Sequence, residues 1–133
     1  MKMGSQGQRT WVIVEAGGSA PVTTGRVLAQ LEGESMPRFV HRVRTAVSAD
    51  HDLQRVILVA GPHHDFSRIA ARSEIARIAA QRVAALGGGS LTLAASDARG
   101  ELAQRALAEI LGEHIGNGVA LRVAGGDVEA LAA

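Results

Sequence analysis

The sequence predicts a single α/β domain built on a mostly parallel sheet, and two observations carry this prediction. An apolar strand at 56–60 is followed by a polar loop, a long Ala- and Arg-rich helix, three glycines and a second apolar strand at 91–95, which is the pattern of a βαβ unit. Both strands are apolar along nearly their whole length, as expected for a sheet that is covered on both faces.

The composition fits one folded domain. The chain has 133 residues, of which 47% are hydrophobic and 20% charged, so it is long enough to bury a core and too apolar for a disordered chain. We expect the domain to span residues 10–126, after a disordered lead-in at 1–9 and before a C-terminal tail at 127–133.

The composition also argues against several classes of function. The chain has no cysteine, which excludes disulfides, thiol catalysis and cysteine-ligated metals. A net charge of +1 and an aromatic content of 2% disfavour nucleic acid as a partner, since such proteins use positive fields and stacking platforms. There is no apolar run of membrane-spanning length and no signal-peptide core, so we expect no membrane contact and a cytoplasmic location.

The first strand is predicted over 10–15 and ends before Gly17 and Gly18. The next stretch, 22–31, has two interpretations. Thr23 and Thr24 could cap a short helix, or the segment from 26 to 31 could be a strand that forms a β-hairpin with the first one. Because a glycine at 25 weakens a helix, we favour the hairpin.

Three helices are expected along the rest of the chain. The first opens at Pro37 and has an apolar face of Phe39, Val40, Val43, Ala46 and Val47, with Arg38, His41, Arg42 and Arg44 opposite. The second runs from about 66 to 86 and stops at the glycines 87–89. The third follows the N-cap Ser96-Asp97 and is expected to bury Leu102, Ala106, Leu107, Ile110 and Leu111. A last strand spans 119–123.

Successive strands joined through helices imply parallel pairing with right-handed crossovers. We therefore expect a three-layer domain with four or five strands and three main helices, plus the N-terminal hairpin. Its general form resembles the Rossmann-like or flavodoxin-like folds, a resemblance of fold that says nothing about activity.

In such sheets, ligands bind beyond the carboxyl ends of the strands. The candidate ligand-binding residues that follow these ends are Gly17, Gly18, Ser19, Gly61, Ser96 and Asp97. His63 is the candidate general base or ligand and Asp65 its orienting partner. Arg68 and Arg72, one helical turn apart, are candidate anion clamps. No metal is expected, because the helix N-terminus behind this loop favours an anion.

Each of these residues also has a structural interpretation. Asp65 or Ser67 could cap the second helix, and the two arginines could form ion pairs with Glu15 or Asp97. The basic face of the first helix could meet solvent, nucleic acid, an acidic partner, or acids from elsewhere in the fold. The glycines fit neither a dinucleotide-binding fingerprint nor a phosphate-binding loop, so the cofactor stays unknown.

We expect a non-catalytic cytoplasmic module that binds a protein partner, a second copy of itself, or a small anionic regulator, because no complete catalytic motif is present. The alanine-rich helices favour close packing and make a homodimer reasonable. The alternative is a small hydrolase or nucleotide-handling enzyme that uses the loop from His63 to Asp65. The sequence leaves the choice between binding module and enzyme open.

Overall fold

The structure is a computed structural model, and it describes residues 9–19, 25–113, 115 and 118–125. In these ranges the elements follow the order β1 (Thr10–Val14), β2 (Arg26–Ala29), α2 (Met36–Ala49), β3 (Arg55–Val59), α3 (Phe66–Ala85), β4 (Gly89–Ala95), α4 (Ala98–Gly112) and β5 (Val119–Gly125). The predicted lead-in up to residue 8 and the predicted tail at 127–133 lie outside the described residues.

The five strands form one sheet in the order β2-β1-β3-β4-β5, and every neighbouring pair is parallel. The predicted parallel α/β class is confirmed. The predicted hairpin is wrong: a strand does form within 22–31, but β2 runs parallel to β1, with Trp11 opposite Arg26. The connection 15–25 is long enough to carry the chain back to the amino end of the sheet, whereas a hairpin needs only about two to five loop residues.

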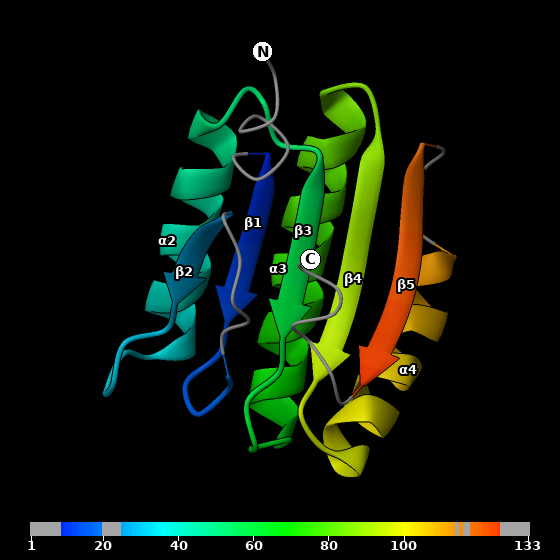
Figure 1. Ribbon diagram of the computed structural model, residues 1–133. Helices are drawn as coiled ribbons and strands as arrows, with labels where there is room; N and C mark the ends of the chain where they lie inside the picture. Colours follow the sequence, from blue (N-terminus) through cyan, green and yellow to red (C-terminus); the bar gives the residue numbers. More distant parts are fainter. Residues whose placement is uncertain (1–8, 20–24, 114, 116–117, 126–133) are drawn as a thin grey trace.

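Figure 1 shows α2, α3 and α4 side by side behind the sheet. The strand order explains this arrangement. From β2 to β3, to β4 and to β5 the chain always steps in the same direction, so right-handed crossovers place all three helices on one face. The described residues therefore form two of the three predicted layers, namely the sheet and one helix layer.

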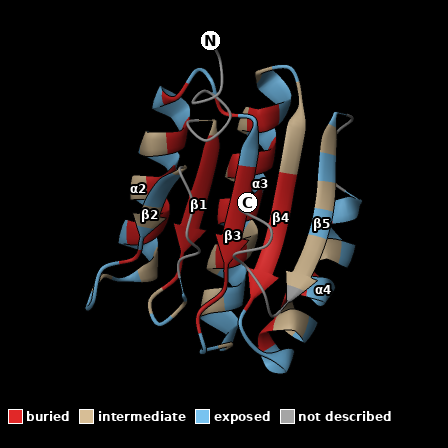
Figure 2. Cartoon of the chain, viewed as in Figure 1, coloured by how far each residue is buried: buried red, intermediate tan, exposed pale blue. Residues whose placement is uncertain are grey.

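The main core lies between the sheet and this helix layer, and the buried centre of the sheet is visible in Figure 2. The apolar face predicted for the first helix is confirmed, since Phe39, Val40, Val43 and Val47 are buried. On the opposite face of the sheet a second buried cluster is formed by Val12, Val14, Ile57, Val59 and Ala94. None of the described helices is long and apolar enough to cross a membrane.

The rotation of α4 differs from the prediction. Leu107 and Leu111 are buried as expected, but Leu102 and Ile110 are 68% and 54% exposed. A Cβ atom on Gly100 would lie only 2.7 Å from the Cβ of Ala95, so this helix approaches β4 through its glycine. That contact turns one face of α4 toward the sheet. The buried residues of this face are Gly100, Gln104, Leu107 and Leu111.

Candidate functional site at the carboxyl edge of the sheet

A buried ion pair lies at the carboxyl edge of the sheet. Glu15 directly follows β1, Arg72 lies in the second turn of α3, and each is only 1% exposed. Nε and Nη2 of Arg72 donate to the two carboxylate oxygens of Glu15, with 3.0 Å between Nη2 and Oε1. Of the ion pairs that the sequence left open for the two arginines, with Glu15 or with Asp97, the structure has Arg72 with Glu15, and the mutual neutralisation is what allows both charges to be buried.

Arg72 also binds the loop that follows β3. Its Nη2 donates to the carbonyl oxygen of His63 at 2.6 Å, and its Nη1 lies 3.1 Å from Nδ1 of His64. The guanidinium is thus surrounded by partners from within the chain. A role for Arg72 as an anion clamp stays a prediction, and it would require this network to open.

His64, rather than His63, has its imidazole in the network. Arginine can only donate, so Nδ1 of His64 accepts and the proton of the neutral ring lies on Nε2. Burial, together with the positive charge of Arg72, lowers the pKa of His64. Its Nε2 is buried and has no hydrogen-bond partner among the described residues. In an extended segment the two histidines point in opposite directions, and the sequence does not reveal which one faces inward.

Asp65 and Asp97 cap the two following helices. Oδ1 of Asp65 accepts from the backbone of Arg68 at 3.1 Å and from the hydroxyl of Ser67 at 2.7 Å, and these hydrogen bonds lower the pKa of Asp65. Oδ1 of Asp97 accepts from the backbone of Gly100 at 2.7 Å. Arg68 is 3.6 Å from Asp65, while His63 and Asp65 are both exposed. The catalytic roles of His63 and Asp65 stay predictions.

The glycines at this edge let two loops touch. A Cβ on Gly17, which has a φ of 84°, would lie 2.6 Å from Cδ of Pro62, and one on Gly61 would lie 2.4 Å from the carbonyl oxygen of Ala16. The backbone of Gly18 donates to the carbonyl of Glu15 at 2.9 Å. Because the strands are parallel, all predicted site residues do lie at one edge of the sheet, and Ser19 and Ser96 are exposed there.

Gln104 is a residue of this edge that the sequence pattern did not single out. This side chain is fully buried, and its Nε2 donates to the carbonyl oxygens of Leu58 and Ala94 at 3.2 and 3.0 Å, which ties α4 to β3 and β4. Its Oε1 has no partner among the described residues. The available signal was spacing, since Gln104 lies three and seven positions before the inward Leu107 and Leu111.

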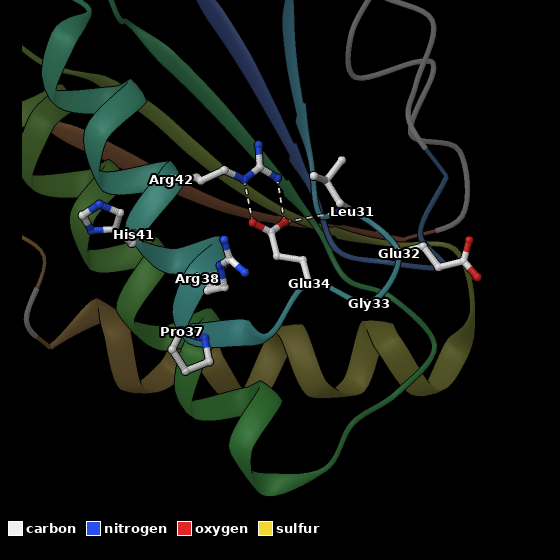
Figure 3. A pocket seen from close by; sticks show the side chains of 8 residues that line it. All are labelled: Leu31, Glu32, Gly33, Glu34, Pro37, Arg38, His41 and Arg42. Carbon is white, nitrogen blue, oxygen red and sulfur yellow. Dashed lines mark hydrogen bonds and ion pairs between the residues drawn. The ribbon is translucent and has the colours of Figure 1, made fainter.

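The basic face of α2 adjoins a groove between the loop 30–35 and the first turns of the helix (Figure 3). The groove has a volume of about 580 Å³ and is lined by Leu31, Glu32, Gly33, Glu34, Pro37, Arg38, His41 and Arg42. Two arginines of the basic face pair with acids from elsewhere, Arg42 with Glu34 at 2.6 Å and Arg44 with Glu74 at 2.8 Å. The hydrogen bonds from Arg42 lower the pKa of Glu34 to about 2.

Arg38 and His41 complete this basic face without a carboxylate partner at ion-pair distance among the described residues. Elsewhere in the same described ranges, no group of three or more His, Asp or Glu side chains is placed to hold a metal ion. In the lining of the groove, the Arg38 guanidinium, the His41 imidazole and the Glu32 carboxylate are therefore accessible polar groups that form no ion pair among the described residues.

The sheet order and the helix layer give the chain a flavodoxin-like or Rossmann-like α/β fold. Comparisons with protein-family models, curated proteins and solved structures gave no match.

Proposed function

We propose that this chain is a non-catalytic α/β module that binds an acidic, extended segment of a partner protein in the groove between the loop 30–35 and α2. The observation that carries this proposal is the guanidinium of Arg38, which has no ion-pair partner among the described residues. It lies with the His41 imidazole beside an open groove with an exposed apolar side chain, Leu31.

The non-catalytic part of the proposal is supported by how the carboxyl edge uses its charges. Arg72 is saturated by Glu15 and by the loop after β3, and Asp65 and Asp97 hold the first turns of two helices. A catalytic base or an anion clamp must be free to meet its substrate. At this edge the same groups stabilise the fold.

The groove is preorganised by hydrogen bonds within its walls. Glu34 accepts from Arg42 and from the backbone of Leu31, so the loop is fixed on the helix. Gln30 accepts from the backbone of Ala16 at 3.0 Å and donates to the carbonyl of Glu34 at 2.9 Å, which ties the loop to the end of β1. A partner segment would meet walls that are already ordered, which lowers the entropy cost of binding.

The side chains of the groove suit an acidic segment with an apolar anchor. Leu31 is 60% exposed and offers apolar contact, while Arg38 offers a charge-assisted hydrogen bond to a carboxylate. The volume of about 580 Å³ lies within the range of roughly 300–1,000 Å³ that is typical of ligand sites. Strand addition to β2 is less suitable, because Arg42 already donates to the carbonyl of Ala29 at 2.8 Å on this edge strand.

A library of short synthetic peptides that combine leucine with aspartate or glutamate tests the proposal. The tightest peptide, measured by fluorescence anisotropy, should lose about tenfold or more in affinity for the Arg38→Glu variant. Arg77→Glu is the matched control, since Arg77 is an exposed arginine of α3 outside the groove and undergoes the same change of charge. Equal binding to both variants would contradict the proposal. Self-association that is lost in Arg38→Glu would point to a second copy of the chain as the occupant.

One observation favours a second candidate, the small hydrolase or nucleotide-handling enzyme. The imidazole of His64 is held beside Arg72, and its Nε2 has no partner among the described residues. A panel of phosphate esters and carboxylic esters should then show turnover that His64→Gln abolishes at an unchanged melting temperature, and His63→Ala tests the histidine named from the sequence. Turnover that is equal in the wild type and both variants would rule this candidate out.

A further inference from the structure

A second cavity opens at the opposite edge of the sheet, where β1, β3 and β4 begin. Its volume is about 230 Å³, and it is lined by Arg9, Thr10, Gln54, Arg55, Gly88, Gly89 and Ser90. This lining contains two guanidinium groups and no carboxylate. The cavity is thus a positively charged hollow at a place that the proposed partner groove does not reach.

Backbone hydrogen bonds join the chain segments that line the cavity. The backbone N–H groups of Gln54 and Arg55 both donate to the carbonyl of Arg9, and that of Ser90 donates to Gln54 at 2.9 Å. A Cβ on Gly89 would lie 1.8 Å from the carbonyl oxygen of Gln54, so only glycine fits between these segments. The cavity therefore exists because three chain segments meet here without intervening side chains.

The sheet register places two polar side chains of the cavity on the same face. Arg55 is directly opposite Ser90 in the β3–β4 ladder, and directly opposite side chains leave a sheet on one side. Arg9, just before β1, is half-buried. Neither Arg9 nor Arg55 has a carboxylate at ion-pair distance among the described residues, whereas the buried Arg72 is fully paired.

We propose that this cavity binds a small oxyanion, namely a phosphate group held by the guanidinium groups of Arg9 and Arg55, with the Ser90 hydroxyl as a third donor. A planar guanidinium fork matches the oxygens of phosphate, and two such groups neutralise a dianion. The volume lies below the roughly 300 Å³ at which sites for larger organic ligands begin, so a small group is the better fit.

One feature of the fold opposes an anion here. The C-terminal end of α3 lies at the same edge, and its dipole is negative there. Its last carbonyls, however, accept from the backbone of Leu86, Gly87 and Gly88, so they are already satisfied. Two unpaired guanidinium groups outweigh the remaining partial charge.

The test is a titration with sodium phosphate at constant ionic strength, followed through the backbone amide signals in NMR. Saturable shifts are expected at Arg55, Gly88, Gly89 and Ser90. Arg55→Gln should weaken the affinity about tenfold or more, and Ser90→Ala a few-fold, because each removes a donor to a charged oxygen. Arg77→Gln removes an arginine outside the cavity and should bind like the wild type.

Non-saturating shifts, or equal affinity in Arg55→Gln and Arg77→Gln, would overturn the proposal. A parallel titration with AMP separates the two sources of phosphate. Affinity equal to that of inorganic phosphate indicates a free oxyanion, and tighter binding indicates a phosphate ester. A peptide that still binds the groove while phosphate fails at the cavity would reject this inference and leave the proposed function standing.

Discussion

The guanidinium of Arg72 holds three segments of the chain together: the end of β1 through Glu15, the loop after β3 through the His63 carbonyl, and its own helix α3. Each of its three nitrogens has an acceptor within the protein, and both charged groups are almost completely buried. Such a pair adds little net stability to the fold. Removing one partner is nevertheless costly, because the other charge is then left buried and unpaired.

Replacing Glu15 with glutamine should therefore destabilise the fold strongly. The change keeps the shape of the side chain but leaves the Arg72 charge uncompensated, which costs about 3–5 kcal/mol in the free energy of unfolding. Glu74→Gln is the control, because its ion pair with Arg44 is about half exposed and contributes only about 0–1 kcal/mol. Urea unfolding measures both changes, and a small, equal effect would show that the Glu15 pair does not hold the fold.

A paired apolar replacement sharpens this experiment. The double variant Glu15→Leu with Arg72→Met removes both charges at once, so it should recover most of the stability that either single loss costs. If the double variant were as unstable as Glu15→Gln, packing rather than the uncompensated charge would be the cause.

The loops and helices are positioned by close backbone approaches at glycines. Gly61 places the loop after β3 against the loop after β1, and Gly100 lets α4 approach β4. The latter contact also sets the rotation of α4, which buries Gln104 and exposes Leu102 and Ile110. Helical periodicity predicts that the most apolar face of a helix is buried. A glycine at a contact point instead favours burial of the face on which it lies, because that face can approach the sheet most closely.

Two glycine-to-alanine changes should have opposite signs. At Gly61 the new Cβ would lie 2.4 Å from a backbone oxygen, and we expect a loss of about 1–3 kcal/mol in the free energy of unfolding. At Gly112, the last residue of α4, no heavy atom lies within 4 Å, and the reduced freedom of the unfolded chain should give a gain of about 0.5–1 kcal/mol. Thermal or urea unfolding compares them, and equal effects would contradict the close contact at Gly61.

Over the whole molecule, stability should fall with acidification in two stages. The pKa of His64 is lowered below its usual 6.5, and that of Glu34 is lowered to about 2 from 4.5. Burial alone would raise the pKa of Asp50, but hydrogen bonds from Trp11 and the backbone of Asp52 lower it overall. Each lowered pKa means that the unfolded chain binds more protons, so stability rises with pH.

The first stage should therefore begin as the pH falls through about 6.5, and the second below about 4.5, where the unfolded chain takes up protons on Glu34 and Asp50 while the folded protein still holds them ionised. Urea midpoints measured from pH 8 to pH 3 test this sequence. His64→Gln should abolish the first stage and leave the second. A first stage that persists in this variant would show that another group is responsible for it.

Local sequence signals were sufficient to predict those features of the structure that depend on a single segment of the chain. The pattern of apolar strands and long helices determined the parallel α/β class, the Pro37 helix and its buried face, and the cap at Asp97, because propensity and periodicity are properties of single segments. The ion pair between Glu15 and Arg72 was one of the alternatives that the sequence offered, because opposite charges were expected at one sheet edge, but the choice between Glu15 and Asp97 came from the structure.

Only the tertiary structure decided the direction of β2, the rotation of α4 and the inward placement of His64. A parallel strand and a hairpin strand have the same alternation of side chains, so the direction depends on where the connection leads. Segments far apart in the chain create the surroundings of His63 and His64, of Gln104, and of Arg9 and Arg55. The sequence alone therefore does not show which of these side chains are buried. The sequence by itself thus determined the class of fold, while the contacts between segments determined which polar groups are buried and which remain free to bind.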